Sequence, residues 1–592
     1  MDKFIRNVHV WEKIEVVLNA QNTFSNPYMD VDVWVDLKGP GFDKRVYGFW
    51  DGDNTFRVRI TAVRPGEWTW VSGSNQNDDG LNGKSDCVSA VEWTENEKEK
   101  NCCRRGFVIA SENGHALEHA DGTPFFIVGD TWLAGATFRH RWYDDDISRP
   151  IGPKAGFKDY VKFRKKQGFN SVVMLASLPA WANDGKTYRL TLDDGVTVVR
   201  DSWVNPETKS GKDMYNEGGR AFLFPGKVPG FEDIYPDIEH INPDYFKYLD
   251  KRVDYLNEQG FIPFIEAARR DVSPCWSKFY DWPRTYVRYV QYIFSRYQSN
   301  NCILSPIHYD WWYGSVPVDE YNICANMVID KYGRPPFGNL LSANSHPSTL
   351  VNFEEKGPQN WLTLHTIGNK REHVHYWLLT EIYNSSPSRP AFNAEPYYAG
   401  YYNLGELYEY GAVGGTETDD LYCRSGMYGG FLSGALGGHM YGAEGIWGAD
   451  IEEGSKYKMW DAFKWNSATE LKNLKIFAMT YGKKYQDLIP NSELVIPNKT
   501  GETKGFTGWA YCAYTKEKDL YLLYFEKDCP KEVEVRRLLR ERTYSIRWFD
   551  TRKGEWIIRS KEKVTTDEMG RVDIERFDSN LDWGMSLVLD ND

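Results

Sequence analysis

The middle of the chain alternates short apolar runs with longer amphipathic patterns, and this alternation restricts the fold more than any other feature. The apolar runs begin near residues 125, 170, 262, 302, 340, 361, 390 and 439. Strands that alternate with helices indicate βαβ units and a parallel sheet. Repeated eight times, the pattern predicts an α/β fold, a (β/α)8 TIM barrel over residues 104–488.

The two ends of the chain have a different pattern. Residues 1–100 and 489–592 alternate apolar and polar positions in short stretches separated by turn residues, as in VWEKIEVVLNA and DLYLLYFEKD. This period of two predicts antiparallel β-sandwiches that flank the barrel on either side. The polar segment TENEKEKNCC between the first two units is interpreted as a linker. A chain of 592 residues is long enough for this three-domain organisation.

Composition excludes several partners. The net charge is −13 and no basic patch stands out, so nucleic acid is not an expected partner. No apolar stretch reaches the ~18 residues of a membrane span. The nine cysteines form no CxxC pair, and the N-terminus lacks the apolar core of a signal peptide, which favours a cytoplasmic protein. A homo-oligomer is left open.

Polar and aromatic residues gather where the predicted strands end. Reactive groups of a TIM barrel lie at the carboxyl ends of its strands, so these positions are the candidate site. The candidates for catalysis are Asp310 and Glu395. The candidates for substrate binding are Asp130, Trp132, Glu266, His308, Trp312, Asn344, His346, His365, Tyr397, His439 and Trp447.

The residue types at these ends suggest the chemistry. Phosphate-binding motifs of the GxxxxGK[ST] and GxGxxG kinds are missing, and so is the GxSxG nucleophile elbow. Carboxylates beside aromatic rings are what glycosidic cleavage requires, because one carboxyl protonates the leaving oxygen while another attacks or stabilises the anomeric centre. Aromatic residues make up 15% of the chain, and ring faces suit the stacking of sugars.

Two carboxylates stand out among the candidates. Glu395 follows the apolar run of RPAFNAEPYY, and Pro396 favours an extended backbone just before it. Asp310 lies in IHYDWW, where neighbouring aromatic side chains are expected to raise its pKa, as a general acid needs. A hydrogen-bonded structural role remains the alternative for each carboxylate. For the strand-end histidines, sugar binding or core packing is favoured over a metal site.

Six motifs together resemble the apiosidase-like clan A glycoside hydrolases. They are FFIVGDTWL, the Asp310 region, SANSHPST, LTLHTIGN, FNAEPYY and HMYGAEGIWG. The first 100 residues resemble the small β-sandwich often fused ahead of such barrels. The C-terminal region is similar to a sandwich sometimes described as collagen-binding.

The resemblance implies a retaining glycosidase in which Glu395 is the nucleophile and Asp310 the acid/base. The family commonly has Gly-Gly-Asp where this chain reads His308-Tyr309-Asp310, so the pocket wall and the substrate are expected to differ. No cofactor is implied. The expected substrates are oligosaccharides or small glycosides, cleaved by exo-action and often furanosidic.

Four other functions stay open at this stage. The barrel would suit a catalytically inactive carbohydrate-binding protein, because the aromatic residues serve either role. The C-terminal region alone suggests a collagen- or matrix-binding protein. The strand-end histidines would serve a metal-dependent hydrolase. A lyase acting on uronic acids would use Arg269 and Arg270 to bind the substrate carboxylate.

Overall fold

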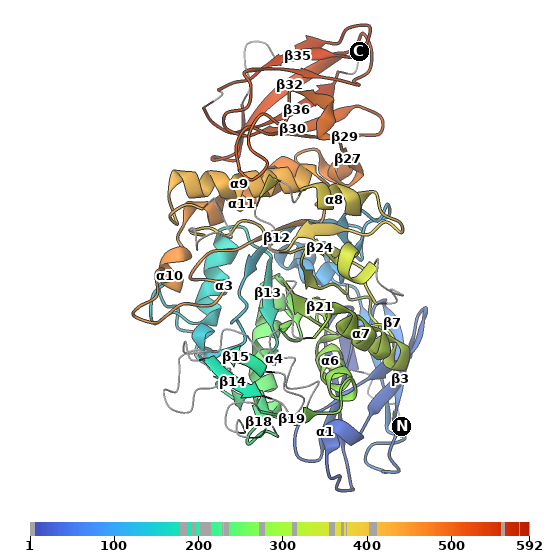
Figure 1. Ribbon diagram of the computed structural model, residues 1–592. Helices are drawn as coiled ribbons and strands as arrows, with labels where there is room; N and C mark the ends of the chain where they lie inside the picture. The colour runs from blue at the N-terminus through green and yellow to red at the C-terminus, as the bar shows by residue number, and fades with distance from the viewer. Residues whose placement is uncertain are drawn as a thin grey trace.

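The structure is a computed structural model. It describes residues 6–590 of the chain apart from 178–186, 192–196, 202–214, 228, 230–231, 233–235, 271–278, 311–315, 355–360, 369–371, 374–375, 402–410, 558–562 and 579. In Figure 1 the C-terminal strands stand beyond α9 and α11 at one end of the molecule. The N-terminal strands β3 and β7 lie near the opposite end, with the parallel strands between.

The N-terminal strands form two sheets around one apolar core. The first has the order β1 (Arg6–His9), β8 (Ser85–Val91), β7 (Gly66–Ser74), β3 (Val33–Gly39), β4 (Phe42–Tyr47), and the second β2 (Ile14–Asn19), β6 (Thr55–Ile60), β5 (Phe49–Trp50). The predicted alternation is clear in β2, whose residues are buried and exposed in turn. One pairing differs from the antiparallel expectation, since β1 runs parallel to β8. The short helix α1 (Pro27–Asp30) follows β2.

The segment interpreted as a linker is instead helical. It forms α2 (Glu95–Lys100) and the 3-10 turn η1 (Cys102–Arg105). Thr94 caps the backbone of Glu97 while the Glu97 side chain caps Thr94, and this capping box satisfies amide groups that a helix start leaves free. A small sheet of β9 (Val108–Ala110), β10 (Leu117–His119) and β11 (Pro124–Phe125) leads into the central unit.

Seven parallel strands form a single curled sheet at the centre. Their order is β21 (Ile303–Ser305), β20 (Ile262–Glu266), β13 (Ser171–Leu175), β12 (Ile127–Thr131), β26 (Gly438–Tyr441), β25 (Ala391–Asn393), β24 (His365–Ile367). All residues of these strands are buried, as is typical of a parallel sheet covered on both faces. They correspond to seven of the eight apolar runs.

The eighth run, near residue 340, does not form the regular strand that was expected. It makes one parallel bridge between Leu304 and Leu341 and continues as β23 (Asn344–Ser345), which pairs with β22 (His308–Tyr309). Side chains make bonds here that a regular ladder would make with backbone groups. Leu341 N donates to Thr363 Oγ1 at 2.7 Å, and Ser342 Oγ donates to Leu364 O at 2.8 Å. In the described residues the sheet is therefore curled, without a closed ladder of eight regular strands.

Helices cover the outside of the curled sheet, and their positions follow the amphipathic patterns of the sequence. The main ones are α3 (Phe157–Lys166), α4 (Pro243–Glu258), α6 (Arg284–Tyr297), α7 (Val318–Tyr332), α8 (Tyr376–Tyr383), α9 (Glu417–Leu432) and α11 (Asn466–Met479). Shorter turns are η2 (Phe138–His140), the π-helical η4 (Leu350–Glu354) and α10 (Met459–Ala462). Three hairpins branch off after β13: β14 (Thr187–Thr191) with β15 (Thr197–Asp201), β16 (Tyr215–Asn216) with β17 (Gly219–Arg220), and β18 (Phe222–Leu223) with β19 (Asp237–Ile241).

The C-terminal strands also form two sheets around their own core. The larger contains β27 (Leu488–Pro490), β29 (Ala510–Thr515), β30 (Leu520–Phe525), β36 (Trp583–Leu589), β32 (Thr543–Asp550), β33 (Glu555–Ile557) and β34 (Lys563–Thr565). The smaller contains β28 (Val495–Ile496), β31 (Glu532–Val535) and β35 (Val572–Glu575). The turn η6 (Gly482–Asp487) contacts α11 of the central unit, and η7 (Ser492–Leu494) contacts β29. No helix in the described part of the chain is long and apolar enough to cross a membrane.

Buried ion pairs join these units to the central sheet. Asp250 of α4 accepts hydrogen bonds from Arg59 of β6 and Arg296 of α6, at 2.6 and 2.7 Å. Arg424 of α9 donates to Asp582, just ahead of β36, at 2.9 Å. These pairs are nearly inaccessible to solvent, so each unit contributes charges that the other must neutralise.

Candidate active site

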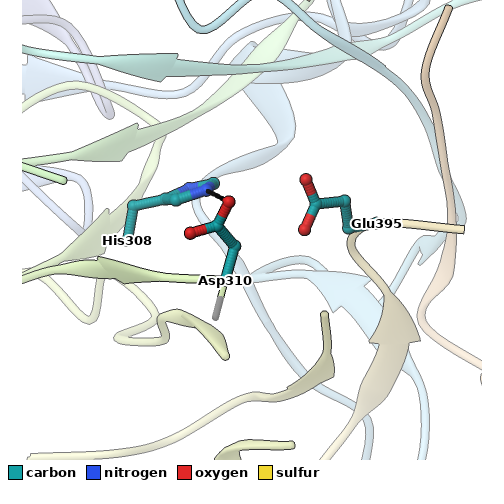
Figure 2. Close-up of side chains that lie close together, drawn as sticks. All are labelled: His308, Asp310 and Glu395. Carbon is teal, nitrogen blue, oxygen red and sulfur yellow. Dashed lines mark ion pairs between the residues drawn. The ribbon is translucent and has the colours of Figure 1, made fainter. Parts of the chain in front are cut away.

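Three of the predicted site residues come together at the carboxyl ends of the parallel strands. His308 belongs to β22, Asp310 follows that strand directly, and Glu395 lies two residues beyond β25. One ligand atom from each of the three lies within 4.8 Å of the others, and all three side chains are buried. Figure 2 shows the Glu395 carboxylate facing that of Asp310, with the His308 ring on the other side of Asp310.

Two arginines bind the Asp310 carboxylate. Arg269 Nη2 donates to Asp310 Oδ2 at 2.8 Å, and Arg270 Nη1 donates to Oδ1. Burial alone would raise the pKa of Asp310, but the positive charges of Arg269 and Arg270 outweigh it and hold this pKa well below its usual range. The pKa shift expected from the neighbouring aromatic residues was therefore wrong in direction.

His308 connects Asp310 to a second buried carboxylate. Its Nδ1 lies 2.5 Å from Glu266 Oε2, and its Nε2 lies 3.4 Å from Asp310 Oδ2. Burial would lower the pKa of His308, but the charge of Glu266, followed by that of Asp310, raises it to about 10. Glu266 Oε1 also accepts from the backbone N–H of Asn344 at 3.0 Å. Glu266 thus orients the imidazole and keeps it charged at neutral pH.

Glu395 contacts a tyrosine and an asparagine. Its Oε1 accepts a hydrogen bond from the Tyr398 hydroxyl at 3.3 Å. Its backbone N–H donates to Asn393 Oδ1 at 3.1 Å, which fixes the chain just after β25. Tyr398 was not among the predicted site residues. The spacing Glu-Pro-Tyr-Tyr gave a choice of two tyrosines, and the neighbouring Tyr397 was selected instead.

Two residues predicted to bind substrate, Asn344 and His346, lie close to the strand that carries His308. Asn344 lies beside His308 in the paired strands β22 and β23, and His346 N donates to Tyr309 O at 2.9 Å. Asn344 Oδ1 is buried and has no hydrogen-bond partner among the described residues. Buried amide oxygens are nearly always paired, so this one is suited to a polar ligand.

Two histidines lie within strands rather than at the strand ends where they were expected. His365 is the first residue of β24, and its Nδ1 lies 2.9 Å from the Thr349 hydroxyl. His439 is the second residue of β26 and is paired in register with Asn393. Burial lowers the pKa of both histidines to about 3, so both are neutral at physiological pH. An apolar run alone does not predict where a strand ends or to which face of the sheet a side chain points, because successive side chains alternate between the two faces.

Asp130 and Trp132 are fully buried and hydrogen-bonded to each other. The Trp132 indole and the Arg164 guanidinium both donate to Asp130 Oδ2 at 2.6 Å. The Trp132 ring stacks on His140, with centroids 5.2 Å apart. These contacts give both residues a packing role, and their predicted contact with substrate stays a prediction.

The last three predicted residues have varied surroundings. The Tyr397 hydroxyl donates to Asp419 at 2.8 Å, which directs it toward the start of α9. The Trp447 indole donates to Glu444 at 3.2 Å, and this ring is only partly buried. Trp312 lies outside the described residues.

Comparison with solved structures gives the class of fold. A crystal structure of a candidate glycoside hydrolase from Bacteroides vulgatus ATCC 8482 matches with a TM-score of 0.61 at 16% identity, covering 99% of this chain and 100% of that one. A second structure from that organism, a glycoside hydrolase family 5 protein, matches with a TM-score of 0.56 at 16% identity, covering 82% of this chain and 94% of that one. The fold is thus one found among glycoside hydrolases.

Comparison with protein families is more specific. Residues 111–484 match the family described as apiosidase-like, catalytic domain, and the chain belongs to this family. Residues 7–75 match a domain of unknown function, DUF5060. A comparison with curated proteins gives no match. The protein is therefore a glycosidase with a carbohydrate substrate, and the resemblance noted in its motifs is confirmed.

Proposed function

We propose that the protein is a retaining glycoside hydrolase, in which Glu395 attacks the anomeric carbon and Asp310 acts as acid and base. The main support is the short separation of the two carboxylates, which have oxygens within 4.8 Å of each other. Retaining enzymes place their carboxyl groups ~5–5.5 Å apart, whereas inverting enzymes leave room for a water molecule between them. The proposal includes a covalent glycosyl–Glu395 intermediate, which this short separation supports.

The proton for the leaving group is stored on His308. Asp310 is ionised in the free protein because Arg269 and Arg270 stabilise its negative charge. His308, charged and 3.4 Å from Asp310, supplies a proton as the glycosidic oxygen binds beside that carboxylate. Asp310 delivers the proton to the leaving oxygen and, in the second step, takes one from the attacking water. Asp310 then passes this proton back to His308, and the ionised Glu266 stabilises the charged imidazole.

The substrate proposal is exo-action on oligosaccharides or small glycosides, furanosidic sugars included. Asn344 Oδ1 and His439 Nδ1 are both buried without a hydrogen-bond partner among the described residues. Sugar hydroxyls would satisfy both, because a hydroxyl can donate to either atom. The same proposal includes a (β/α)8 barrel over residues 104–488, with sandwich domains at 1–100 and 489–592.

The test follows the anomeric configuration of the first product. Wild-type protein is incubated with a panel of aryl furanosides and pyranosides, and the early product is observed by proton NMR before mutarotation. A product with the configuration of the substrate supports the double displacement. A product of opposite configuration contradicts it and assigns Glu395 to the activation of water.

A bound cation is the second candidate for the same three residues, because their ligand atoms converge within 4.8 Å. Two arginines already neutralise Asp310, and a charged His308 would repel a cation. These charges favour the glycosidase with no metal at this position. Activity that survives extensive dialysis against a chelator would support that choice, and activity restored only by a divalent cation would reverse it.

A further inference from the structure

A groove lies where the N-terminal sheets meet the central unit, on the side opposite the catalytic residues. Its volume is about 390 Å³, within the range of small-ligand sites, and it is called the junction groove below. Its lining includes Trp11, Trp93, Asn257, Ser299 and Asn300. The last three precede β20 and β21, so the groove lies at the amino ends of those strands. Asp310 and Glu395 lie at the carboxyl ends, which makes the two sites separate.

We propose that the junction groove binds a neutral carbohydrate chain. The first observation is a pair of buried polar atoms in residues that line the groove: Ser299 Oγ and Asn300 Oδ1 make no hydrogen bond with the described residues. Their residues are 2% and 4% exposed. Unpaired polar groups at such burial are rare in folded proteins and point to a ligand or water.

The orientation of Asn300 is fixed by its own neighbours. Its Nδ2 donates to Asp254 Oδ1 at 2.9 Å and to Asn257 Oδ1 at 3.2 Å. Turning the amide over would place its oxygen against two acceptors, which costs hydrogen bonds and adds repulsion. Asn300 Oδ1 is therefore held beside the groove as an acceptor, and only a donor such as a hydroxyl can satisfy it.

Trp11 forms the apolar wall of the groove and is held in an unusual conformation. Its φ is 63°, in the left-handed region that large side chains avoid. A Cβ added at Gly106 would lie 2.8 Å from Trp11 Cε2, so glycine allows the backbone to approach the ring. Left-handed residues other than glycine concentrate at binding sites, where the surrounding structure holds them. A rigid indole beside amides and a hydroxyl is the arrangement that recognises a sugar ring.

The charges of the groove favour a neutral ligand. Among its described lining residues, Lys13 and Arg104 are cationic, whereas Glu12, Asp254 and Glu258 are anionic. Lys13 is paired with Asp254, and Arg104 lies over the Trp93 ring at 4.3 Å. An anionic ligand such as a nucleotide would meet more negative than positive charge. A polyhydroxylated neutral chain meets no such barrier.

Binding is tested by affinity gel electrophoresis with Glu395→Gln protein, so that turnover does not remove the ligand. The gels contain arabinan, galactan, xyloglucan or glucomannan, and polygalacturonate serves as the anionic arm. We expect at least one neutral polysaccharide to retard the protein. Ser299→Ala should weaken that retardation roughly fivefold, the effect of one hydrogen bond, and Trp11→Ala should weaken it about tenfold.

Structural effects are separated by two controls. The Ser299 hydroxyl has no partner, so Ser299→Ala should leave the thermal midpoint unchanged while it weakens binding. Trp377→Ala removes a tryptophan that is 48% exposed on α8 and should leave retardation unchanged. The proposal is overturned if no neutral polysaccharide retards the protein, if polygalacturonate alone does, or if Ser299→Ala and Trp11→Ala bind like the parent. If the wild type cleaves no glycoside while the Glu395→Gln protein is retarded, the proposed function is refuted and this inference stands.

Discussion

Arg269 donates a hydrogen bond to the Asp310 carboxylate at 2.8 Å, and this contact determines the ionisation of the proposed acid/base. Together with Arg270 it lowers the pKa of a carboxyl that burial would otherwise raise. A general acid usually has a raised pKa. The proton must therefore be held by a neighbour, and His308 is the charged neighbour of Asp310 that can release one, because arginine stays protonated.

Replacing Arg269 by glutamine is expected to move the alkaline limb of the pH–activity profile to higher pH. The substitution removes a positive charge beside Asp310, so the pKa values of Asp310 and His308 both rise. The proton that the leaving group needs is then retained to a higher pH. The measurement is kcat/KM against pH on an aryl glycoside. Arg45→Gln is the matched control, because Arg45 pairs with Asp36 at the same 2.8 Å on the exposed N-terminal sheet. An unchanged alkaline limb in Arg269→Gln would show that Arg269 does not control the ionisation of the proposed acid/base.

Replacing Glu266 by glutamine should move the alkaline limb of the pH–activity profile to lower pH. Glu266 is the main cause of the His308 pKa of about 10, so its neutral analogue lowers that pKa. A histidine with a raised pKa stabilises the fold fully below its unfolded pKa, ~6.5. That stability is lost as the pH rises through about 10. In Glu266→Gln the loss occurs at lower pH.

Titration of the His308 ring provides the measurement for this second prediction. Carbon-13 labelled histidine would show the His308 signal titrating near pH 10 in the wild type and lower in Glu266→Gln. His365, whose pKa is lowered to about 3, serves as an internal control that stays neutral above pH 5 in both proteins. A His308 that titrates identically in both would mean that Glu266 does not hold its charge.

The spacing of apolar residues in the sequence predicted most of the strands and helices. The rule that reactive groups lie at the carboxyl ends of parallel strands predicted where the candidate site lies. His308, Asp310 and Glu395 come from segments far apart in the chain and meet within 4.8 Å, as their positions after apolar runs indicated. The run near residue 340 was predicted as a regular strand, but the side chains of Thr363 and Ser342 take part in its hydrogen bonds alongside backbone groups. Helix α2 was missed although its capping box, Thr94 and Glu97, is readable from the sequence.

What periodicity could not predict is which charges meet. Arg269 and Arg270 were placed at a strand end, but their pairing with Asp310 depends on the distance between two neighbouring strands and on side-chain conformation. The pKa of Asp310 was therefore assigned from adjacent residues in the sequence, and its direction was wrong. Periodicity also did not predict how far a residue lies from the end of its strand: His365 and His439 each lie two residues before the last residue of their strands.

The roles of the two carboxylates are distinguished by substrates that differ in leaving group. Glu395→Gln should lose about 10³-fold or more in kcat on every substrate, because the attacking oxygen is lost. Asp310→Asn should lose as much in kcat/KM on an alkyl glycoside and far less in kcat/KM on a dinitrophenyl glycoside, whose departure in the first step needs no proton. Glu381→Gln, an exposed position on α8, is the control. Equal losses on both substrates in Asp310→Asn would remove Asp310 from the acid role.

The buried Asp250 provides a stability prediction that is independent of catalysis. Burial would raise its pKa, but Arg296 and Arg59 together lower it far below the ordinary value. Asp250→Asn leaves Arg59 paired only with Glu15 and Arg296 only with Asp51, and breaking such a buried network costs about 3–5 kcal/mol. For a carboxyl with a lowered pKa, the stabilisation is complete above the unfolded value, ~3.9, and disappears as the pH falls toward the folded value.

Urea unfolding at several pH values measures this effect. The difference between wild type and Asp250→Asn should be constant between pH 6 and 8 and should shrink below about pH 4, as protonation removes the charge from the wild-type carboxyl. Asp244→Asn, in an exposed pair with Lys247 at 2.9 Å on the same helix, should change stability by less than about 1 kcal/mol. Because Arg59 belongs to β6 and Arg296 to α6, the N-terminal sheets should also unfold together with the central unit in the wild type. Two separate transitions in the wild type, or equal effects of the two substitutions, would show that this ion pair does not couple the units.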